Sequence, residues 1–299
     1  MPRRAPKVKG LFTALLTPFD GEGRADAGRA ADLVRFQVSK GADGIYVCGS
    51  TGLGPMLGVD ERKAITEAAV GAAGKVPVVV QVGCADTRST VRLAKHAEKA
   101  GAYAVASLTP YYYRPGELAV AKHFGAVSKA VTLPLLAYNI PQFTGNNLLP
   151  ETVAALADAG TIAGVKDSCR DLPQLLDLID RVPEGFVVMN GAEEYGLFAM
   201  MSGADGLVSG GANALPELMK SMVAAEMKGA HQGAIEAQAR IREFKALVRA
   251  SPIPSYYAIL RARGLDCGSP RRPFLGLRRA ESDRLISTLR RLGFLSPSG

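Results

Sequence analysis

Apolar runs alternate with amphipathic stretches eight times in this chain of 299 residues. The runs are short and bounded by turn residues, which indicates buried parallel strands beginning near Leu11, Gly44, Val76, Tyr103, Leu135, Ile162, Phe186 and Gly206. The amphipathic stretches predict helices at 26–40, 60–73, 86–100, 117–130, 150–159, 171–181 and 193–202, with an eighth after Asn213. Eight strand–helix units predict an α/β fold of the (β/α)8 TIM-barrel type. A doubly wound sheet is the alternative, but no Gly-x-Gly-x-x-Gly motif follows the first run.

A helical tail follows the eighth unit. Patterns at 234–250, 256–263 and 280–292 predict three more helices, and no low-complexity linker separates them from the preceding units. We therefore expect one folding unit, with the barrel at 1–226 and a C-terminal helical extension at 227–299 packed on it.

Charge and cysteine usage narrow the range of partners. The net charge is +8, but the C-terminal arginines are spread over predicted helices without interleaved aromatic residues, so we expect solvated basic faces and no nucleic-acid partner. A basic protein suits an acidic small-molecule substrate. The cysteines are far apart and form no Cys-x-x-Cys motif, which argues against a zinc site or a disulfide framework.

Nothing in the sequence indicates a membrane or export segment. No apolar stretch is long enough to span a bilayer. Residues 1–9 are basic, but the apolar run after them is short and stops at Pro18, so a signal peptide is not expected. We expect a cytoplasmic location and no membrane partner.

In a (β/α)8 barrel the active site lies at the C-terminal ends of the strands. The segments that follow the predicted strands are rich in hydroxyl groups and glycine, and they contain one lysine and no histidine. His96, His123 and His231 fall in predicted helices, where we expect them to pack or to face solvent. This excludes histidine triads and most metal chemistry, so we expect no metal site.

The one lysine is Lys166, at the end of the sixth apolar run. Burying a lysine is costly, and Schiff-base chemistry needs an amine that burial keeps partly neutral. The alternative is a lysine that extends to the barrel mouth and pairs with Asp167. Strand alternation places Ile162, Gly164 and Ser168 on the side of Lys166, and Gly164 would leave room beside the lysine stem.

Tyr138 lies in the fifth run on the face it shares with Leu136 and Ile140. From that neighbouring strand its phenol can reach Lys166 and act as a proton shuttle. The alternative is a core tyrosine with one satisfied hydroxyl.

The second strand ends in Gly49-Ser50-Thr51-Gly52, a turn with two hydroxyls. Such a turn can bind a carboxylate or a phosphate. The same residues are also ordinary loop composition, and no Gly-Lys-Ser/Thr follows to make a P-loop.

Motifs along nearly the whole chain resemble the dihydrodipicolinate synthase / N-acetylneuraminate lyase superfamily. The matching pieces are Leu15-Leu16-Thr17-Pro18-Phe19, Gly49-Ser50-Thr51-Gly52, Thr109-Pro110-Tyr111-Tyr112, Tyr138-Asn139-Ile140-Pro141, Gly164-Val165-Lys166 and Gly203-Ala204-Asp205-Gly206. The resemblance implies a class I lyase or aldolase that handles pyruvate on a (β/α)8 barrel with a helical C-terminal extension. It also implies a homotetramer and no cofactor.

The resemblance assigns roles to individual residues. Lys166 would form the Schiff base and Tyr138 would be the general acid and base. Ser50 and Thr51, in the turn that begins at Gly49, would hold the pyruvate carboxylate. Tyr112 matches the tyrosine that, in the synthases, reaches the site of a neighbouring subunit.

Departures from the family pattern bear on the substrate. Phe143 stands where the synthases carry an arginine, and a phenyl ring cannot replace a bidentate guanidinium, which argues against dihydrodipicolinate synthesis. Leu53 in Thr-Gly-Leu-Gly-Pro resembles the 2-keto-3-deoxygluconate aldolases. Tyr138-Asn139-Ile140-Pro141 and Asn190-Gly191 resemble the neuraminate lyases, and Glu193-Glu194 falls where those lyases carry an acidic pair. Gly-Val-Lys-Asp-Ser resembles 4-hydroxy-2-oxoglutarate aldolase.

We therefore expect a pyruvate-dependent aldolase. It would cleave a 2-keto-3-deoxy sugar acid into pyruvate and an aldehyde, or form the sugar acid from these two compounds. A neuraminate-type lyase or 4-hydroxy-2-oxoglutarate aldolase is the alternative, followed by the synthase, and a non-catalytic protein that binds a 2-oxo acid comes last. The substrate-binding set that we expect beside the catalytic residues is Gly49, Ser50, Thr51, Gln142, Phe143, Ser168, Glu193 and Val208. Ser168, Gln142 and Glu193 offer neutral or acidic groups suited to hydroxyls.

Overall fold

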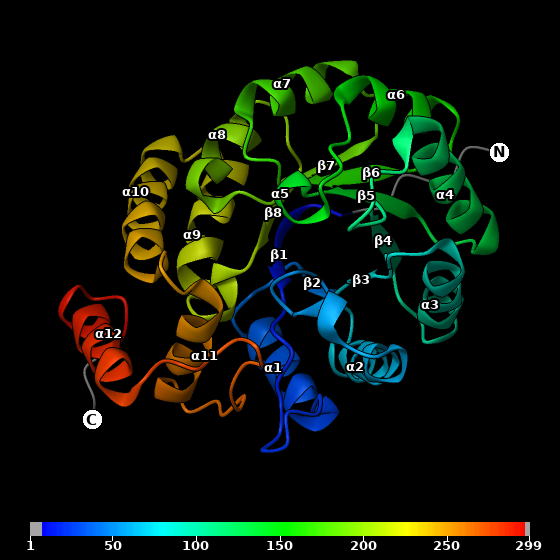
Figure 1. The fold of residues 1–299 in the computed structure, drawn as a ribbon. Coiled ribbons are helices and arrows are strands. Elements are labelled where there is room, and N and C mark those ends of the chain that lie inside the picture. Colours follow the sequence, from blue (N-terminus) through cyan, green and yellow to red (C-terminus); the bar gives the residue numbers. More distant parts are fainter. Residues whose placement is uncertain (1–7, 297–299) are drawn as a thin grey trace.

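The computed structural model describes residues 8–296, so residues 1–7 of the basic N-terminal stretch lie outside the described part. Eight parallel strands pair in chain order, and β8 also pairs with β1, which closes the barrel (Figure 1). The strands are β1 (Gly10–Ala14), β2 (Gly44–Val47), β3 (Val78–Gln81), β4 (Ala104–Leu108), β5 (Leu135–Asn139), β6 (Gly164–Asp167), β7 (Val187–Asn190) and β8 (Gly206–Ser209). The predicted TIM barrel is confirmed.

A ring of helices surrounds these strands (Figure 1). Its members are α1 (Ala27–Ser39), α2 (Val59–Ala72), α3 (Thr87–Lys99), α4 (Gly116–Ala130), α6 (Pro150–Asp158), α7 (Leu172–Arg181), α8 (Gly196–Met201) and α9 (Pro216–Met227). Asp26, Asp86 and Asp171 cap α1, α3 and α7, each accepting a hydrogen bond from the backbone N–H three residues on. Most predicted boundaries therefore hold within two residues, because the caps were visible in the sequence.

Two local elements differ from the prediction. The helix expected at 193–202 begins with a 3₁₀ turn, Glu193–Tyr195, before α8. A short helix, α5 (Pro141–Thr144), follows β5 and was not predicted. Four residues are too few to display a helical period, yet this helix carries two of the predicted substrate-binding residues.

The tail consists of α10 (His231–Val248), α11 (Pro252–Ala262) and α12 (Arg279–Arg291). Helix α10 lies along α9, and α12 packs on α11 at the outer edge of the molecule (Figure 1). Tyr257 of α11 donates a hydrogen bond to the carbonyl oxygen of Thr17 at 2.6 Å, and Arg263 donates one to that of Ala214 at 2.7 Å. These bonds fix the extension to the barrel; the exact division at 226/227 stays a prediction.

The structure also bears on the membrane question. Within residues 8–296, no helix combines the length and the apolar character that crossing a membrane requires.

All four cysteines are free.

Glycines allow the strands to approach one another inside the barrel. A Cβ on Gly206 of β8 would overlap the backbone of Gly10 in β1. A Cβ on Gly164 would lie 2.8 Å from the carbonyl oxygen of Val187 and 3.3 Å from Leu136. Gly164 thus makes room for the neighbouring strands, and the expectation that it also makes room for the stem of Lys166 stays a prediction.

Replacing Gly206 by alanine should lower the free energy of unfolding by about 1–3 kcal/mol, because the added methyl group forces β1 and β8 apart. Gly125→Ala is the matched control: nothing lies within 4 Å of the added atom, and alanine favours the helical state over glycine. Urea unfolding followed by circular dichroism measures both. Equal stability of the two variants would contradict the account of barrel closure.

Candidate active site

Lys166 lies in β6 with 4% of its surface exposed. Its amine sits over two aromatic rings, 4.3 Å from the centroid of Tyr46 and 4.0 Å from that of Tyr138. Among residues 8–296, no carboxylate lies within ion-pair distance of this amine. Asp167 points to the other side of the strand, where its carboxylate accepts hydrogen bonds from Asn139 and from the N–H of Cys169. The alternative pairing of Lys166 with Asp167 is therefore not observed.

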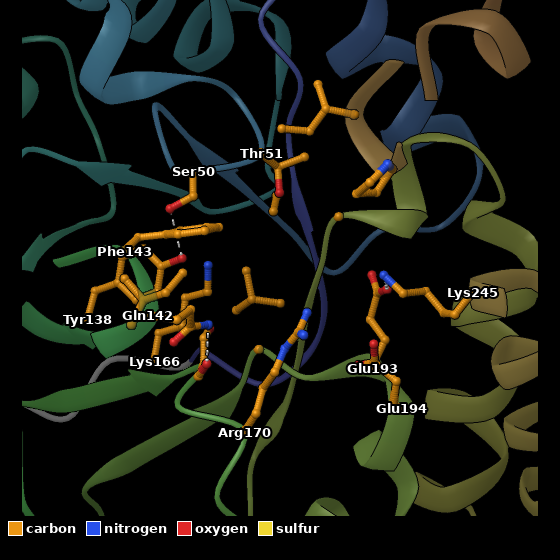
Figure 2. Close-up of a pocket in the computed structure, with 18 of the residues that line it drawn as sticks. Ser50, Thr51, Tyr138, Gln142, Phe143, Lys166, Arg170, Glu193, Glu194 and Lys245 are labelled. Carbon is orange, nitrogen blue, oxygen red and sulfur yellow. Dashed lines mark hydrogen bonds and ion pairs between the residues drawn. The ribbon is translucent and has the colours of Figure 1, made fainter. Parts of the chain in front are cut away.

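Tyr138 stands opposite Lys166 because the register of β5 against β6 pairs these two residues. Its hydroxyl lies 3.2 Å from the hydroxyl of Ser50, at the edge of the pocket (Figure 2). The hydrogen bond joins Tyr138, whose ring lies beneath the Lys166 amine, to the turn after β2. This arrangement fits a phenol that moves protons near the lysine.

Tyr46, in β2, belongs to the same cluster and was not singled out from the sequence. Its ring lies edge-on to that of Tyr138, with centroids 5.9 Å apart. Burial, followed by the neighbouring Tyr138, raises the pKa of Tyr46 well above its ordinary value. Tyr46 is therefore held as a neutral phenol, and we assign it to enclosing the amine of Lys166. In the sequence, the alternation of inward and outward side chains along β2 was the pattern that could have identified Tyr46.

The turn after β2 is held in an unusual backbone conformation. Cys48 and Leu53 both have positive φ, 58° and 55°, which is rare for residues other than glycine. The N–H of Gly54 bonds to the carbonyl oxygen of Gly49 at 2.9 Å, and that of Leu53 bonds to Ser50 at 3.1 Å. Strain of this kind persists only where the surroundings enforce it. The turn thus presents its hydroxyls in a fixed position.

The site is a cavity of about 250 Å³ at the C-terminal ends of the strands, where the barrel rule places it. Nine of the predicted residues line it: Ser50, Thr51, Tyr138, Gln142, Phe143, Lys166, Ser168, Glu193 and Val208. Gly49 lies behind the lining, and a Cβ there would come within 3.0 Å of Tyr46. The structure therefore brings together all but two of the predicted residues.

Tyr112 is the second exception. It is 86% exposed, has a φ of 79°, and stacks edge-on against Tyr113 instead of lining the cavity. Within one chain it does not reach Lys166. Its role at the site of a neighbouring subunit stays a prediction.

Glu193 is placed differently from the expectation that it faces substrate hydroxyls. Its carboxylate, 3% exposed as a residue, accepts hydrogen bonds from the hydroxyl of Ser209 at 2.5 Å and the N–H of Gly211 at 2.6 Å. Its other oxygen lies 2.6 Å from the amine of Lys245. Burial alone would raise the pKa of Glu193, but Lys245 and the two donors outweigh it and lower the pKa. The carboxylate is therefore already engaged within the protein.

Lys245 is a second lysine of the same cavity, contributed by α10 of the tail. Burial would lower its pKa, but the carboxylate of Glu193 raises it above the ordinary value. This amine stays protonated and cannot act as a nucleophile. Of the two lysines in the cavity, only Lys166 has no carboxylate partner in the described part of the chain.

Arg170 also lines the cavity and was missed from the sequence. It follows β6 with a φ of 62°, and its guanidinium extends into the cavity (Figure 2). From the sequence we expected neutral or acidic groups to meet the aldehyde half of the substrate. Arg170 adds a cation from the loop after β6.

The histidines lie outside the site, as predicted. His123 is buried and bonds to Thr87 at 2.9 Å, and burial lowers its pKa to about 4. His96 and His231 pair with Glu67 and Glu226 respectively.

Glu193→Gln should lower the free energy of unfolding by about 3–5 kcal/mol at neutral pH, because it leaves the ammonium of Lys245 buried without a carboxylate. The double variant Glu193→Gln/Lys245→Met removes that charge and should regain part of the loss. Denaturant titrations of the wild type, Glu193→Gln, Lys245→Met and the double variant measure the coupling. No recovery in the double variant would contradict the proposed pairing.

The ion pair of Glu193 and Lys245 also makes the free energy of unfolding depend on pH. The pKa of Glu193 is lowered from 4.5, so the stabilisation is fully present above pH 4.5 and is lost as the pH falls through the lowered pKa. The stability gap between the wild type and Glu193→Gln should therefore shrink in acid.

Comparison with known sequences adds independent information. The profile of the Dihydrodipicolinate synthetase family matches residues 7–292. A 4-hydroxy-tetrahydrodipicolinate synthase from Azoarcus sp. is 35% identical over 289 residues, which cover 96% of this chain and 99% of that protein.

Solved structures agree with these matches. YagE, a prophage protein of the dihydrodipicolinic acid synthase family from E. coli K12, was crystallised in complex with pyruvate. It superposes with a TM-score of 0.92 at 26% identity, covering 97% of this chain and 100% of that one. KD(P)GA from T. tenax gives a TM-score of 0.87 at 33% identity and covers 94% of this chain and 98% of that one.

Proposed function

The chain belongs to the dihydrodipicolinate synthetase family, and from that premise we propose that it forms a Schiff base with pyruvate and makes or breaks the adjacent carbon–carbon bond. Proteins of this family are lyases of the aldolase type, so the chain is an enzyme of that class. The observation that carries the proposal is the amine of Lys166, buried over two tyrosine rings at the C-terminal mouth of the barrel.

The proposed reaction in the cleavage direction follows from this geometry. Neutral Lys166 attacks the C2 carbonyl of a 2-oxo acid, water leaves, and the protonated imine withdraws electrons. Tyr138, as phenolate, takes the proton from the C4 hydroxyl. The C3–C4 bond then breaks, which releases an aldehyde and leaves an enamine of pyruvate. Protonation at C3 and hydrolysis of the imine free pyruvate and restore the amine.

The pyruvate carboxylate would bind to the hydroxyls of Ser50 and Thr51. Both line the cavity beside Tyr138, and the strained turn fixes their position. Ser50 would serve twice, because its hydroxyl also lies within hydrogen-bond distance of Tyr138.

For the aldehyde half we propose a polyhydroxylated chain, so that the substrate is a 2-keto-3-deoxy sugar acid. The hydroxyl of Ser168 and the amide of Gln142 line this part of the cavity. Gln142 uses its amide nitrogen to bond the carbonyl oxygen of Ser168 at 2.9 Å, which leaves its amide oxygen as an acceptor. Phe143 offers no ionic contact there.

The second candidate is dihydrodipicolinate synthesis. The name of the Azoarcus relative favours it. Phe143, in the place of the synthases' arginine, argues against it.

We also propose a cytoplasmic homotetramer, a dimer of dimers. Tyr112 and Tyr113 expose 86% and 76% of their surface on one loop. A pair of exposed aromatic rings suits an interface with another copy of the chain. Light scattering on the purified protein tests the assembly.

Lys166→Arg should abolish imine formation and leave the fold intact, because an arginine does not lose its proton. Exchange of the methyl protons of pyruvate in D2O, followed by proton NMR, reports enamine formation without any aldehyde. Lys245→Arg is the matched control, and we expect it to retain exchange since that residue stays an ion-paired cation. Exchange of the pyruvate protons by the Lys166→Arg variant, or the absence of this exchange in the wild type, would overturn the proposal.

Tyr138→Phe should retain part of the pyruvate proton exchange but lose carbon–carbon cleavage by about 10²-fold or more, the usual contribution of an acid–base group. The physical reason is the loss of the phenol beside the reacting amine. A steady-state assay of pyruvate release measures the effect. Near-normal cleavage would show that the proton travels through Ser50 or a water molecule instead.

Glyceraldehyde should be a better acceptor than aspartate semialdehyde by at least about tenfold in kcat/KM, or roughly 1.4 kcal/mol. A site that hydrogen-bonds hydroxyls rejects substrates lacking them, because its polar groups stay unpaired. Equal or better use of the semialdehyde would favour the synthase. Phe143→Arg should then improve use of the semialdehyde and leave glyceraldehyde little changed.

A further inference from the structure

We propose that Arg170 determines substrate specificity by binding an anionic group at the far end of the aldehyde half of the substrate. The proposal rests on the function proposed above and deepens it. It gives the substrate two anionic ends, one held beside Ser50 and Thr51 and the other held by Arg170.

The backbone around Arg170 is anchored on both sides. Before it, the N–H of Cys169 bonds to the carboxylate of Asp167 at 3.0 Å. After it, Asp171 caps α7 by accepting from the N–H of Gln174 at 3.0 Å. Arg170 itself has a φ of 62°, a strained conformation for a residue with a Cβ. The anchors hold this conformation, and the side chain, which is exposed to solvent, also lines the cavity.

The position of Arg170 separates it from the predicted pyruvate carboxylate site. Figure 2 shows the Arg170 side chain away from Ser50 and Thr51, between Lys166 and the Glu193–Lys245 pair. A substrate joined to Lys166 through C2 has its carboxylate at C1 and the aldehyde-derived carbons beyond C3. The two ends diverge from C2, so a carboxylate held at Ser50 and Thr51 leaves the aldehyde end free to extend toward Arg170.

The charges of the cavity leave Arg170 available. Glu193 and Lys245 neutralise each other at 2.6 Å. Lys166 is taken up by the covalent bond to pyruvate. Glu194 is exposed and also lines the cavity, but no carboxylate of residues 8–296 lies within 4.0 Å of the Arg170 guanidinium.

A guanidinium in this state matches a carboxylate or a phosphate. Its planar set of N–H donors bonds both groups in a bidentate manner, and hydrogen bonds of this kind are stronger than those between neutral groups. A neutral hydroxymethyl end would leave most of these donors to water. Arg170 thus selects a charged group at the far end of the substrate, while Ser168 and Gln142 bind the hydroxyls that precede this group.

The experiment compares three acceptors that share an aldehyde and a neighbouring hydroxyl. Glyceraldehyde ends in a neutral hydroxymethyl group, tartronate semialdehyde ends in a carboxylate, and glyceraldehyde 3-phosphate ends in a phosphate. Condensation of each with pyruvate is measured as kcat/KM for the wild type, Arg170→Gln and Arg92→Gln. Arg92 is exposed on α3, outside the cavity lining, so its variant changes the net charge equally without touching the site.

We expect the wild type and Arg92→Gln to prefer at least one anionic acceptor over glyceraldehyde by about tenfold or more, the scale of a charge-assisted hydrogen bond. Arg170→Gln should lose that preference, so that its kcat/KM for the anionic acceptor divided by that for glyceraldehyde falls about tenfold or more. A preference for the carboxylate or for the phosphate identifies which anion the site takes. Proton exchange of pyruvate in D2O by Arg170→Gln shows that the variant is folded.

The contrary outcomes are distinct. No pyruvate exchange by the wild type would refute the proposed function itself. Normal exchange without an anionic preference, or with a preference that survives in Arg170→Gln, would refute the role of Arg170 alone. A higher KM for pyruvate in the exchange assay of Arg170→Gln would place the guanidinium at the pyruvate carboxylate and overturn the inference.

Discussion

The register between β5 and β6 is the constraint on which the site depends. In a closed parallel barrel every second side chain points inward, and this register sets Tyr138 opposite Lys166. The lysine amine then lies over the rings of both Tyr138 and Tyr46, at the edge of the cavity. A shift of one residue would turn Tyr138 to the helix side and separate phenol from amine. The glycines that allow neighbouring strands to approach closely, Gly164 and Gly206, therefore support the chemistry indirectly.

The helical tail is part of the site and not only a cover for the barrel. It contributes Lys245, whose pairing with Glu193 keeps that amine protonated. The cavity thus holds two lysines with opposite roles, one bound to a carboxylate and one free of it. Arg170 adds a third cation from the loop after β6. This division of charge lets a basic cavity hold anionic groups while one amine remains available for covalent chemistry.

Much of the fold and of the site could be predicted, and the failures have physical reasons. Strand alternation placed Tyr138 beside Lys166, because period-two patterns define faces directly. It could not show that Gly164 serves the neighbouring strands, since that depends on the spacing across the sheet. Lys245 escaped because helical periodicity gives no information on which strand end a tail helix meets. Arg170 escaped because its direction is set by an unusual φ that composition alone does not reveal.

Of the two lysine amines in this cavity, we expect only that of Lys166 to bond to pyruvate. Reduction with borohydride in the presence of pyruvate converts the imine into a stable adduct, which peptide mass spectrometry can locate. We expect one adduct per chain, on the peptide that contains Lys166. An adduct on Lys245, or no adduct at all, would show that Lys166 is not the Schiff-base residue.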